Sequence, residues 1–249
     1  MKKLALIPSR FQSSRFPGKP LALINDKPIV MWVYDAVKNA DLFDDVFIAT
    51  DDDRIANVVK ENGGEYIMTS STLSCGTERC EQALSFLEKD GKCYDVVVNI
   101  QGDEPLIQKE QIVKVLEGFE YQNADIVTLI KLIDKANDVD DKNIVKVVKS
   151  KTDKALYFSR SRVPFNRDKD LNDLISKGIY YKHIGIYGYR AEVLHKITKL
   201  EESVLEKTEK LEQLRWLENG YNIIVKETSI DSIGVDTPED LENIKKIIK

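Results

Sequence analysis

Short apolar runs alternate with amphipathic stretches along the first half of the chain. Runs at 4–7, 46–49, 66–68 and 95–100 are dominated by aliphatic residues, which is typical of strands buried on both faces of a parallel sheet. The stretches around them carry apolar residues at helical spacing, and they lie at 29–37, 55–59, 77–87 and 111–119. The pattern predicts an α/β fold with a doubly wound, mainly parallel, Rossmann-like sheet.

The second half begins with three runs that are typical of strands, with no helix between them. They cover 126–132, 144–149 and 155–158, and the polar residues 150–154 are typical of a hairpin turn. We therefore expect an antiparallel excursion from the sheet, which could cover the site or meet a second subunit. The charged run 167–177 is predicted to be a solvated loop.

Composition limits the class of partner. The chain has 249 residues, 42% of them hydrophobic, a formal net charge of −5 and a pI near 5.3. Length allows one α/β domain or two small ones, and we predict a single domain over 1–249. The acidic balance argues against a nucleic-acid partner, which would require a basic face. Local basic clusters are therefore expected to serve a small anion.

The cysteines and the N-terminus bear on location. Cys75, Cys80 and Cys93 fit neither a zinc ribbon nor a Cys-x-x-Cys pair, so we predict reduced thiols, with a reactive thiol at Cys75 as the alternative. The first apolar run is too short for a signal peptide or a membrane span and ends in a proline. We expect a cytoplasmic protein with no membrane partner.

The segment 8–21 has an unusual concentration of side chains that can bind an anion. It contains Arg10, Arg15 and Lys19 together with hydroxyl groups and a glycine, and its three prolines disfavour helix. Guanidinium groups bind phosphate oxygens through paired hydrogen bonds and lysine adds a compact charge, so the loop suits a polyphosphate. A solvated basic loop is the alternative. No Gly-x-Gly-x-x-Gly motif or P-loop occurs to bind a nucleotide instead.

Carboxylates are predicted to meet this loop. In an open α/β sheet, ligands bind beyond the carboxyl ends of the strands, where the loop, the turn at Thr50 and the turn at 101–103 all lie. Asp103 could hold magnesium together with phosphate oxygens, and Asp236 is a second candidate. For an isolated Asp236, an ordinary turn or cap is the alternative. The acidic cluster 51–53 is expected to complement the N-terminus of the helix that follows it.

Two further signals concern structure. His183 and His195 are the only histidines and show no metal-site spacing, and His195 is interpreted as a scaffold residue. A last helix is predicted to open at Thr237, with Pro238 in the first turn and Asp240 completing a capping box.

The loop pattern Ser9-Arg10 followed by 13–21 resembles the nucleotide loop of the CMP-KDO synthetase family, the sugar-acid cytidylyltransferases that act on 3-deoxy-manno-octulosonate (KDO). Further segments resemble the same family in its order and cover essentially the whole chain. They lie at 49–52, 76–79, 99–105, 157–161, 183–190, 211–215 and 234–241.

The resemblance implies a nucleotidyltransferase-type fold and a magnesium-dependent transfer of CMP from CTP to KDO. CMP-KDO and pyrophosphate would be the products, and lipopolysaccharide core synthesis the pathway. It also implies a nucleotide-binding part at about 1–125, a sugar-binding and dimerisation part at about 126–230, and a homodimer.

The resemblance also implies roles for individual residues. Catalysis falls to Arg10, Lys19, Asp103 and Asp236, with the two aspartates as magnesium ligands. The residues implied to bind the nucleotide are Arg10, Ser13, Arg15, Lys19, Thr50, Gly76, Arg79 and Gln101. Those implied to bind the sugar acid are Arg15, Gln101, Arg160, His183, Tyr187, Glu212 and Gln213. A surface ion pair between Glu212 and Arg215 is the alternative for Glu212.

Three departures from the family pattern leave the acceptor open. Cys75 replaces a common serine, Glu78 replaces the usual aspartate, and 162–164 reads Arg-Val-Pro where Ser-Pro-Ile-Pro is typical. Another acidic sugar, such as amino-substituted KDO or a neuraminate-like acid, is therefore the alternative acceptor. A non-catalytic nucleotide-binding module is the alternative from a different class.

Overall fold

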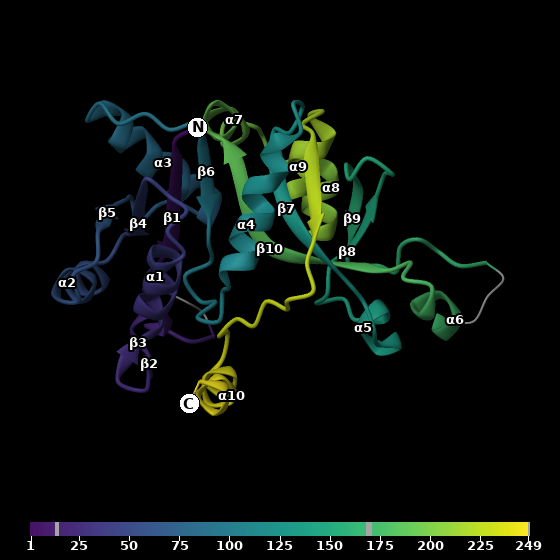
Figure 1. Ribbon diagram of the computed structural model, residues 1–249, viewed down its shortest axis with the longest axis horizontal. Helices are drawn as coiled ribbons and strands as arrows, with labels where there is room; N and C mark the ends of the chain where they lie inside the picture. The colour runs from purple at the N-terminus through teal and green to yellow at the C-terminus, as the bar shows by residue number, and fades with distance from the viewer. Residues whose placement is uncertain (13–14, 168–170, 249) are drawn as a thin grey trace. The chain divides into compact units, whose positions relative to one another are not determined.

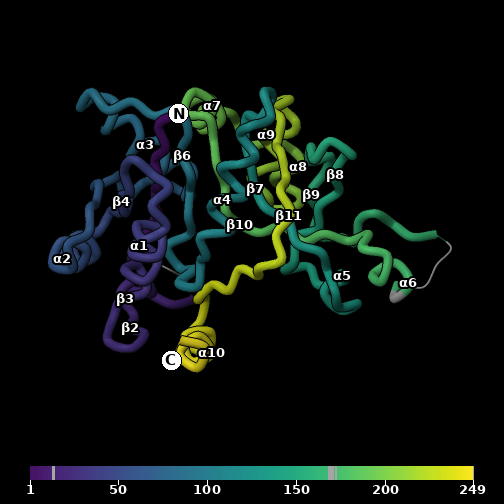
Figure 2. Tube along the Cα trace, in the orientation of Figure 1, coloured from purple at the N-terminus to yellow at the C-terminus, as the bar shows by residue number. Residues whose placement is uncertain are grey.

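The computed structural model describes residues 1–12, 15–167 and 171–248. The chain divides into two compact units. The first comprises Met1–Ile112, Tyr189–Thr198 and Ser232–Lys249, and the second Val113–Gly188 and Lys199–Asp231. Figure 2 traces the chain as it leaves the first unit and returns to it twice. The division into a nucleotide-binding part at about 1–125 and a sugar-binding part at about 126–230 stays a prediction.

Four parallel strands form the sheet of the first unit, in the order β6-β1-β4-β5. Their bounds are β1 (Lys3–Ser9), β4 (Asp45–Thr50), β5 (Tyr66–Met68) and β6 (Val96–Asn99). Leu6 pairs with Phe47 on one side and with Asn99 on the other, and the aliphatic residues of β1 are fully buried. The continuous apolar runs are therefore the central strands of a parallel sheet, as predicted.

The first unit contains the helices predicted around 29–37, 55–59 and 77–87 and the last helix predicted to open at Thr237, together with one helix and one 3₁₀ turn whose bounds were not predicted (Figure 1). They are α1 (Ile29–Asn39), α2 (Asp53–Glu61), α3 (Gly76–Lys89), α7 (Ala191–Ile197), α10 (Pro238–Ile247) and the 3₁₀ turn η1 (Lys19–Leu21). The chain passes to the second unit within α4 (Lys109–Glu117). On α1, Ile29, Val33 and Val37 are fully buried, so the helical spacing marks the face that packs on the sheet.

A small hairpin, β2 (Leu23–Ile24) with β3 (Lys27–Pro28), was not predicted. Its turn residues Asn25 and Asp26 have φ of 48° and 62°. Positive φ at both positions is typical of the tight turn that joins paired strands, but the usual glycine is absent. The sequence therefore carried only a weak signal for it.

The last helix has the predicted start. The Thr237 hydroxyl accepts a hydrogen bond from Asp240 N at 3.2 Å, and the Asp240 carboxylate accepts one from Thr237 N at 2.8 Å. Leu241 and Ile244 pack against Ile24 and Ile29 in one apolar cluster. These contacts fix the N-cap Thr237, and Asp236 N, one residue earlier, donates to the same Asp240 carboxylate at 3.1 Å.

The second unit holds a mixed set of strands. Its strands are β7 (Ile126–Leu132), β8 (Lys146–Lys149), β9 (Ala155–Ser159), β10 (Tyr181–Arg190, of which the last two residues belong to the first unit) and β11 (Ile223–Glu227). β11 and β7 are parallel, whereas β8 pairs antiparallel with β9 and β10. Ser150 N donates to Lys154 O at 2.8 Å across the predicted hairpin turn. The antiparallel excursion is thus confirmed.

The helices of the second unit are short. They are η2 (Gly118–Glu120), α5 (Ala136–Asp140), α6 (Leu171–Ser176), α8 (Val204–Glu209) and α9 (Gln213–Glu218). The prediction of a solvated loop over 167–177 was wrong for α6. Leu171, Leu174 and Ile175 pack with Tyr180 in an apolar cluster, since three apolar residues at helical spacing outweigh the surrounding charges.

The described helices include none that is long and apolar enough to span a lipid bilayer. All three cysteines are free thiols, as predicted, with Cys80 buried, Cys93 exposed and Cys75 between the two.

Candidate active site

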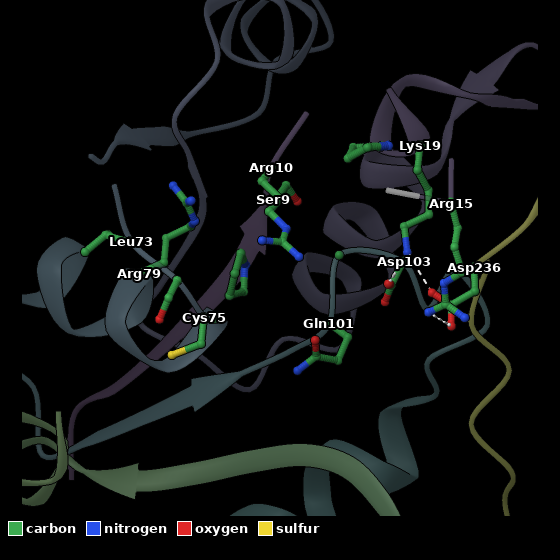
Figure 3. A pocket seen from close by; sticks show the side chains of 15 residues that line it. Ser9, Arg10, Arg15, Lys19, Leu73, Cys75, Arg79, Gln101, Asp103 and Asp236 are labelled. Atoms are coloured by element: carbon green, nitrogen blue, oxygen red, sulfur yellow. Dashed lines mark hydrogen bonds and ion pairs between the residues drawn. The ribbon is translucent and has the colours of Figure 1, made fainter. Parts of the chain in front are cut away.

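A cavity of about 270 Å³ opens in the first unit, beyond the carboxyl ends of β1 and β6 (Figure 3). Loops from distant parts of the chain form its wall. The lining residues are Pro8, Ser9, Arg10, Arg15, Lys19, Pro20, Leu73, Ser74, Cys75, Gly76, Arg79, Gln101, Gly102, Asp103 and Asp236. The predicted meeting of the N-terminal loop with the turn at 101–103 is therefore present.

Gly102 allows the two strand-end loops to approach each other. A Cβ atom at this position would lie 2.7 Å from the carbonyl oxygen of Pro8 and would also collide with the Ser9 side chain. Only a residue without a side chain fits between the loops. This close packing holds Gln101 and Asp103 beside the loop that follows β1.

A cluster of alternating charges lies at one end of the cavity. The Nζ atom of Lys19 lies 2.5 Å from Asp103 Oδ2 and 3.2 Å from Asp236 Oδ1, and Arg15 Nη2 lies 3.0 Å from Asp236 Oδ2. The Lys19 side chain is only 12% exposed. Both carboxylates therefore converge on one partly desolvated cation, in a region where electrostatic interactions are stronger than in bulk water.

Arg79 lines the cavity while making a buried ion pair. Its Nη2 donates to Asp51 Oδ2 at 3.1 Å and its Nη1 donates to Thr69 Oγ1 at 2.5 Å, with only 3% of the side chain exposed. Asp52 is the residue that caps α2, accepting from Arg54 N at 2.9 Å. The expectation for the acidic cluster is therefore confirmed for Asp52, whereas Asp51 has an additional role in holding Arg79.

Thr50 and Ser13 differ from the other predicted nucleotide-binding residues. Thr50 is fully buried and, among the described residues, is not one that lines the cavity. Its hydroxyl accepts from Asp52 N at 3.3 Å and its carbonyl accepts from Thr69 N at 2.7 Å, so it braces the turn after β4. Ser13 lies outside the described residues. Gly76 and Gln101 both line the cavity.

Sequence reasoning missed several residues near the cavity. Leu73 and Ser74 line it from a segment that carries no chemical motif. Glu104 follows Asp103, and burial raises the pKa of its carboxyl to about 7, against the opposing effect of a hydrogen bond with Ser232. Its position beside Asp103 was the one available signal, because burial of a side chain is not readable from a single sequence.

In the second unit, a ring cluster contains two of the predicted sugar-binding residues. The Tyr187 ring centroid lies 5.2 Å from that of His183 and 5.2 Å from that of Trp216 on α9. Burial lowers the pKa of His183 to about 4, and its Nε2 lies 2.9 Å from the Thr128 hydroxyl. Burial and the charge of Glu212 raise the pKa of Tyr187 well above its usual value. Both side chains are therefore neutral hydrogen-bonding groups near pH 7.

Arg160 has a structural role in addition to its predicted one. Its Nε donates to Glu209 O at 2.8 Å, Nη1 to Lys142 O at 3.0 Å and Nη2 to Lys210 O at 3.3 Å. These carbonyls include the end of α8, where a cation is favourable. Arg160 thus joins the end of β9 to two loops, and its contact with a sugar carboxylate stays a prediction.

The remaining predicted sugar-binding residues lie at the start of α9. Gln213 is buried there and Glu212 precedes it. Arg215 forms a close ion pair with Glu206, with Nη2 2.6 Å from Oε1 and Nε 2.6 Å from Oε2. The surface pair considered between Arg215 and Glu212 is therefore not the main contact of Arg215, which instead ties α9 to α8.

A metal at this site would have few protein ligands. The part of the chain that the structure describes contains no group of three or more His, Cys, Asp or Glu side chains arranged to hold a metal ion. Asp103 and Asp236 form a two-carboxylate set, the ligand number that magnesium uses beside phosphate oxygens and water.

Comparisons with known proteins agree with one another. The family model for cytidylyltransferases matches residues 4–230. A 3-deoxy-manno-octulosonate cytidylyltransferase from Parabacteroides distasonis is 49% identical over 246 residues, covering 97% of this chain and 96% of its own. The protein of the same name from Thermodesulfovibrio yellowstonii is 47% identical over 251 residues, covering 100% and 98%.

Solved structures give the same result. A structure of CMP:2-keto-3-deoxy-manno-octonic acid synthetase complexed with CTP has a TM-score of 0.91 and 37% identity, covering 100% of this chain and 98% of its own. A cytidylyltransferase from Leptospira borgpetersenii, 18% identical with a TM-score of 0.63, shares the fold, with coverage of 100% and 87%. The chain belongs to the cytidylyltransferase family and, within it, to the 3-deoxy-manno-octulosonate cytidylyltransferases, also called CMP-KDO synthetases.

Proposed function

We propose that this chain transfers the CMP group of CTP to KDO and releases pyrophosphate. The anomeric hydroxyl of KDO attacks the α-phosphorus of CTP and a new bond forms from that oxygen to phosphorus. The bond to the bridging oxygen of the β-phosphate breaks, pyrophosphate leaves, and the hydroxyl proton is released to water. The observation that carries the proposal is the cluster of Lys19, Asp103 and Asp236 in a cavity also lined by Arg10 and Arg15.

The cations of the cavity would bind the triphosphate. Arg10, Arg15 and Lys19 all lie on the loop after β1 and reach the same cavity. Guanidinium and ammonium groups fixed beside phosphate oxygens stabilise the charge that spreads over them during phosphoryl transfer. Catalysis of this kind depends on positioning and charge, so no covalent nucleophile is needed.

Magnesium fits the two carboxylates. Oxygen atoms of Asp103 and Asp236 already converge on the single Nζ atom of Lys19, and carboxylate oxygens are the ligands that magnesium prefers. Bound there, a magnesium ion would neutralise charge on the phosphate oxygens and help to orient them. Lys19 would then pair with the triphosphate as well as with the carboxylates.

The acceptor would be recognised by neutral and charged hydrogen-bonding groups of the second unit. His183 and Tyr187 offer neutral groups in a buried ring cluster, and Gln213 offers an amide. A site that hydrogen-bonds its substrate discriminates strongly, because a wrong sugar leaves buried polar groups without partners.

The test is pyrophosphate release with CTP and a panel of three acceptors: KDO, its amino-substituted analogue and neuraminate. We expect KDO to be used with the highest kcat/KM by at least tenfold. A higher kcat/KM for either rival sugar would overturn the acceptor, and the Arg162–Val163 departure would be the first position to revert. No pyrophosphate from CTP with any acceptor would favour a non-catalytic nucleotide-binding module.

The same proposal includes a cytoplasmic homodimer that supplies CMP-KDO for the lipopolysaccharide core. Its oligomeric part is checked by light scattering on the purified protein, which should give twice the chain mass of 28.4 kDa. A mass equal to a single chain at micromolar concentration would overturn it.

A further inference from the structure

Phe11 lies directly after Arg10 of the cavity and contacts a cation from another element. The guanidinium carbon of Arg54, in the first turn of α2, lies 3.3 Å from the centroid of the Phe11 ring. At this distance the planar cation stacks on the π face of the ring and is attracted by it. The loop after β1 is thereby connected to the start of α2.

The Arg54 guanidinium is itself held in place. Its Nε donates to Asp52 Oδ1 at 2.9 Å and its Nη2 donates to Asp52 Oδ2 at 2.7 Å, so the carboxylate binds the flat fork through two parallel hydrogen bonds. Asp52 is also the N-cap of α2. The plane on which Phe11 stacks is therefore fixed to the helix that follows β4.

Phe11 also contacts the other end of the loop. Gly18 N donates to Phe11 O at 2.9 Å, and a Cβ atom on Gly18 would lie 3.1 Å from Cζ of the Phe11 ring. Gly18 has φ of +73°, which favours glycine, and it caps the 3₁₀ turn that begins with Lys19. The Phe11 ring thus contacts Gly18, the residue before Lys19, and Phe11 itself directly follows Arg10 in the chain.

We propose that Phe11 and Arg54 are positioning residues for CTP, which anchor the triphosphate-binding loop to α2 and so set the places of Arg10 and Lys19. The inference rests on the proposed function of that loop. Among the residues that the structure describes, Arg54 is not one that lines the cavity, and its charge is paired with Asp52. Arg54 therefore acts through the Phe11 ring.

The test is a double-mutant cycle on CTP binding. Arg54→Ala removes the cation, and Phe11→Leu keeps apolar bulk against Gly18 while removing the π face. A stacked pair of this kind at a partly exposed site is expected to change the dissociation constant of CTP by about two- to fivefold. Each substitution breaks the same contact. The dissociation constant of the double variant should therefore be about the same as that of either single variant. Calorimetry measures the dissociation constant of CTP for the wild type and for each variant.

A matched control pair lies on α3. Lys89 Nζ lies 5.7 Å from the centroid of the Phe86 ring, near the helix end distant from the cavity. Lys89→Ala and Phe86→Leu should leave the dissociation constant of CTP unchanged. A substitution that only lowered stability would lower the melting temperature and leave the dissociation constant of CTP unchanged.

The outcomes separate the two proposals. A wild-type protein that does not bind CTP would overturn the proposed function. A wild-type protein that binds CTP, together with an unchanged dissociation constant in Arg54→Ala and Phe11→Leu, would overturn the anchor alone. Independent effects that multiply in the double variant would also overturn it, since they would show that the two side chains do not act through one contact.

Discussion

The cavity of the first unit and the ring cluster of the second unit use different physical chemistry. In the cavity, Lys19, Asp103 and Asp236 form a cluster of paired charges on loops. In the ring cluster, His183 and Tyr187 pack on Trp216, and burial shifts both pKa values toward the neutral forms. Charged side chains can stabilise a phosphate group whose negative charge increases during the reaction. Neutral buried side chains can recognise the hydroxyl groups of a substrate through hydrogen bonds. The predictions below separate these two kinds of recognition.

The largest effect is expected from Asp103→Asn. The change keeps the shape of the side chain and removes a charge from the proposed metal site, so kcat should fall at least about a hundredfold. Asp35→Asn is a matched control, because Asp35 on α1 forms a similar ion pair, with Lys27 Nζ 2.5 Å from Asp35 Oδ2. Near-normal turnover in Asp103→Asn, measured by magnesium-dependent pyrophosphate release, would remove Asp103 from the site.

Lys19→Ala should weaken CTP use and leave the preference among sugar acids unchanged. Loss of a charge-assisted hydrogen bond of about 1.5–3 kcal/mol corresponds to a rise of roughly 10- to 150-fold in KM for CTP. Lys27→Ala provides the control for loss of a lysine. If the sugar preference shifted while KM for CTP did not, the loop after β1 would belong to the acceptor instead.

The converse change is His183→Gln in the second unit. It should raise KM for KDO by about tenfold, as expected for one lost hydrogen bond in a site that excludes water, and leave KM for CTP within twofold. His195→Gln, in the first unit, serves as the control. A rise in KM for CTP alone would contradict the assignment of the ring cluster to the sugar.

The smallest effect is on stability, and it has opposite signs at the two histidines. Burial lowers the pKa of His183 to about 4. The unfolded chain then binds more protons than the folded one between pH 6.5 and 4, so stability is lost as the pH falls through that window. For His195, burial also opposes the charged form, but hydrogen bonds and charges from Glu81 and Glu88 outweigh it and raise the pKa.

His195 therefore contributes stability that is fully present below pH 6.5 and is lost as the pH rises through its folded pKa. Titration of the two imidazoles by NMR checks both signs. A His183 ring that titrates at or above 6.5, or a His195 ring that titrates below 6.5, would contradict the environments described here.

The sequence was sufficient to predict where the charge cluster lies, because its residues follow the ends of predicted strands or precede a predicted helix. Parallel strands share one carboxyl edge, so Arg10 after β1 and Asp103 after β6 had to lie near each other once the apolar runs were recognised. The capping signature at Thr237 similarly located Asp236. Local signals and one rule of topology were sufficient for these residues.

Other features depend on packing between side chains that no local signal records. The Asp51 contact of Arg79 joins residues 28 positions apart, and the carbonyl contacts of Arg160 reach residues up to 50 positions away. Helix α6 was missed because its three apolar residues lie within a charged run. In each case the outcome depends on how distant segments pack, which a single sequence does not specify.

The central claim is that one cavity, formed by the loops after β1 and β6 and the segment before α10, binds the triphosphate and its metal. A crystal structure of the protein with CTP and magnesium tests it most directly. The account predicts phosphate oxygens within hydrogen-bonding distance of Arg10, Arg15 and Lys19, with the metal bound by Asp103 and Asp236. A triphosphate bound outside this cavity, or a metal held without either aspartate, would contradict it.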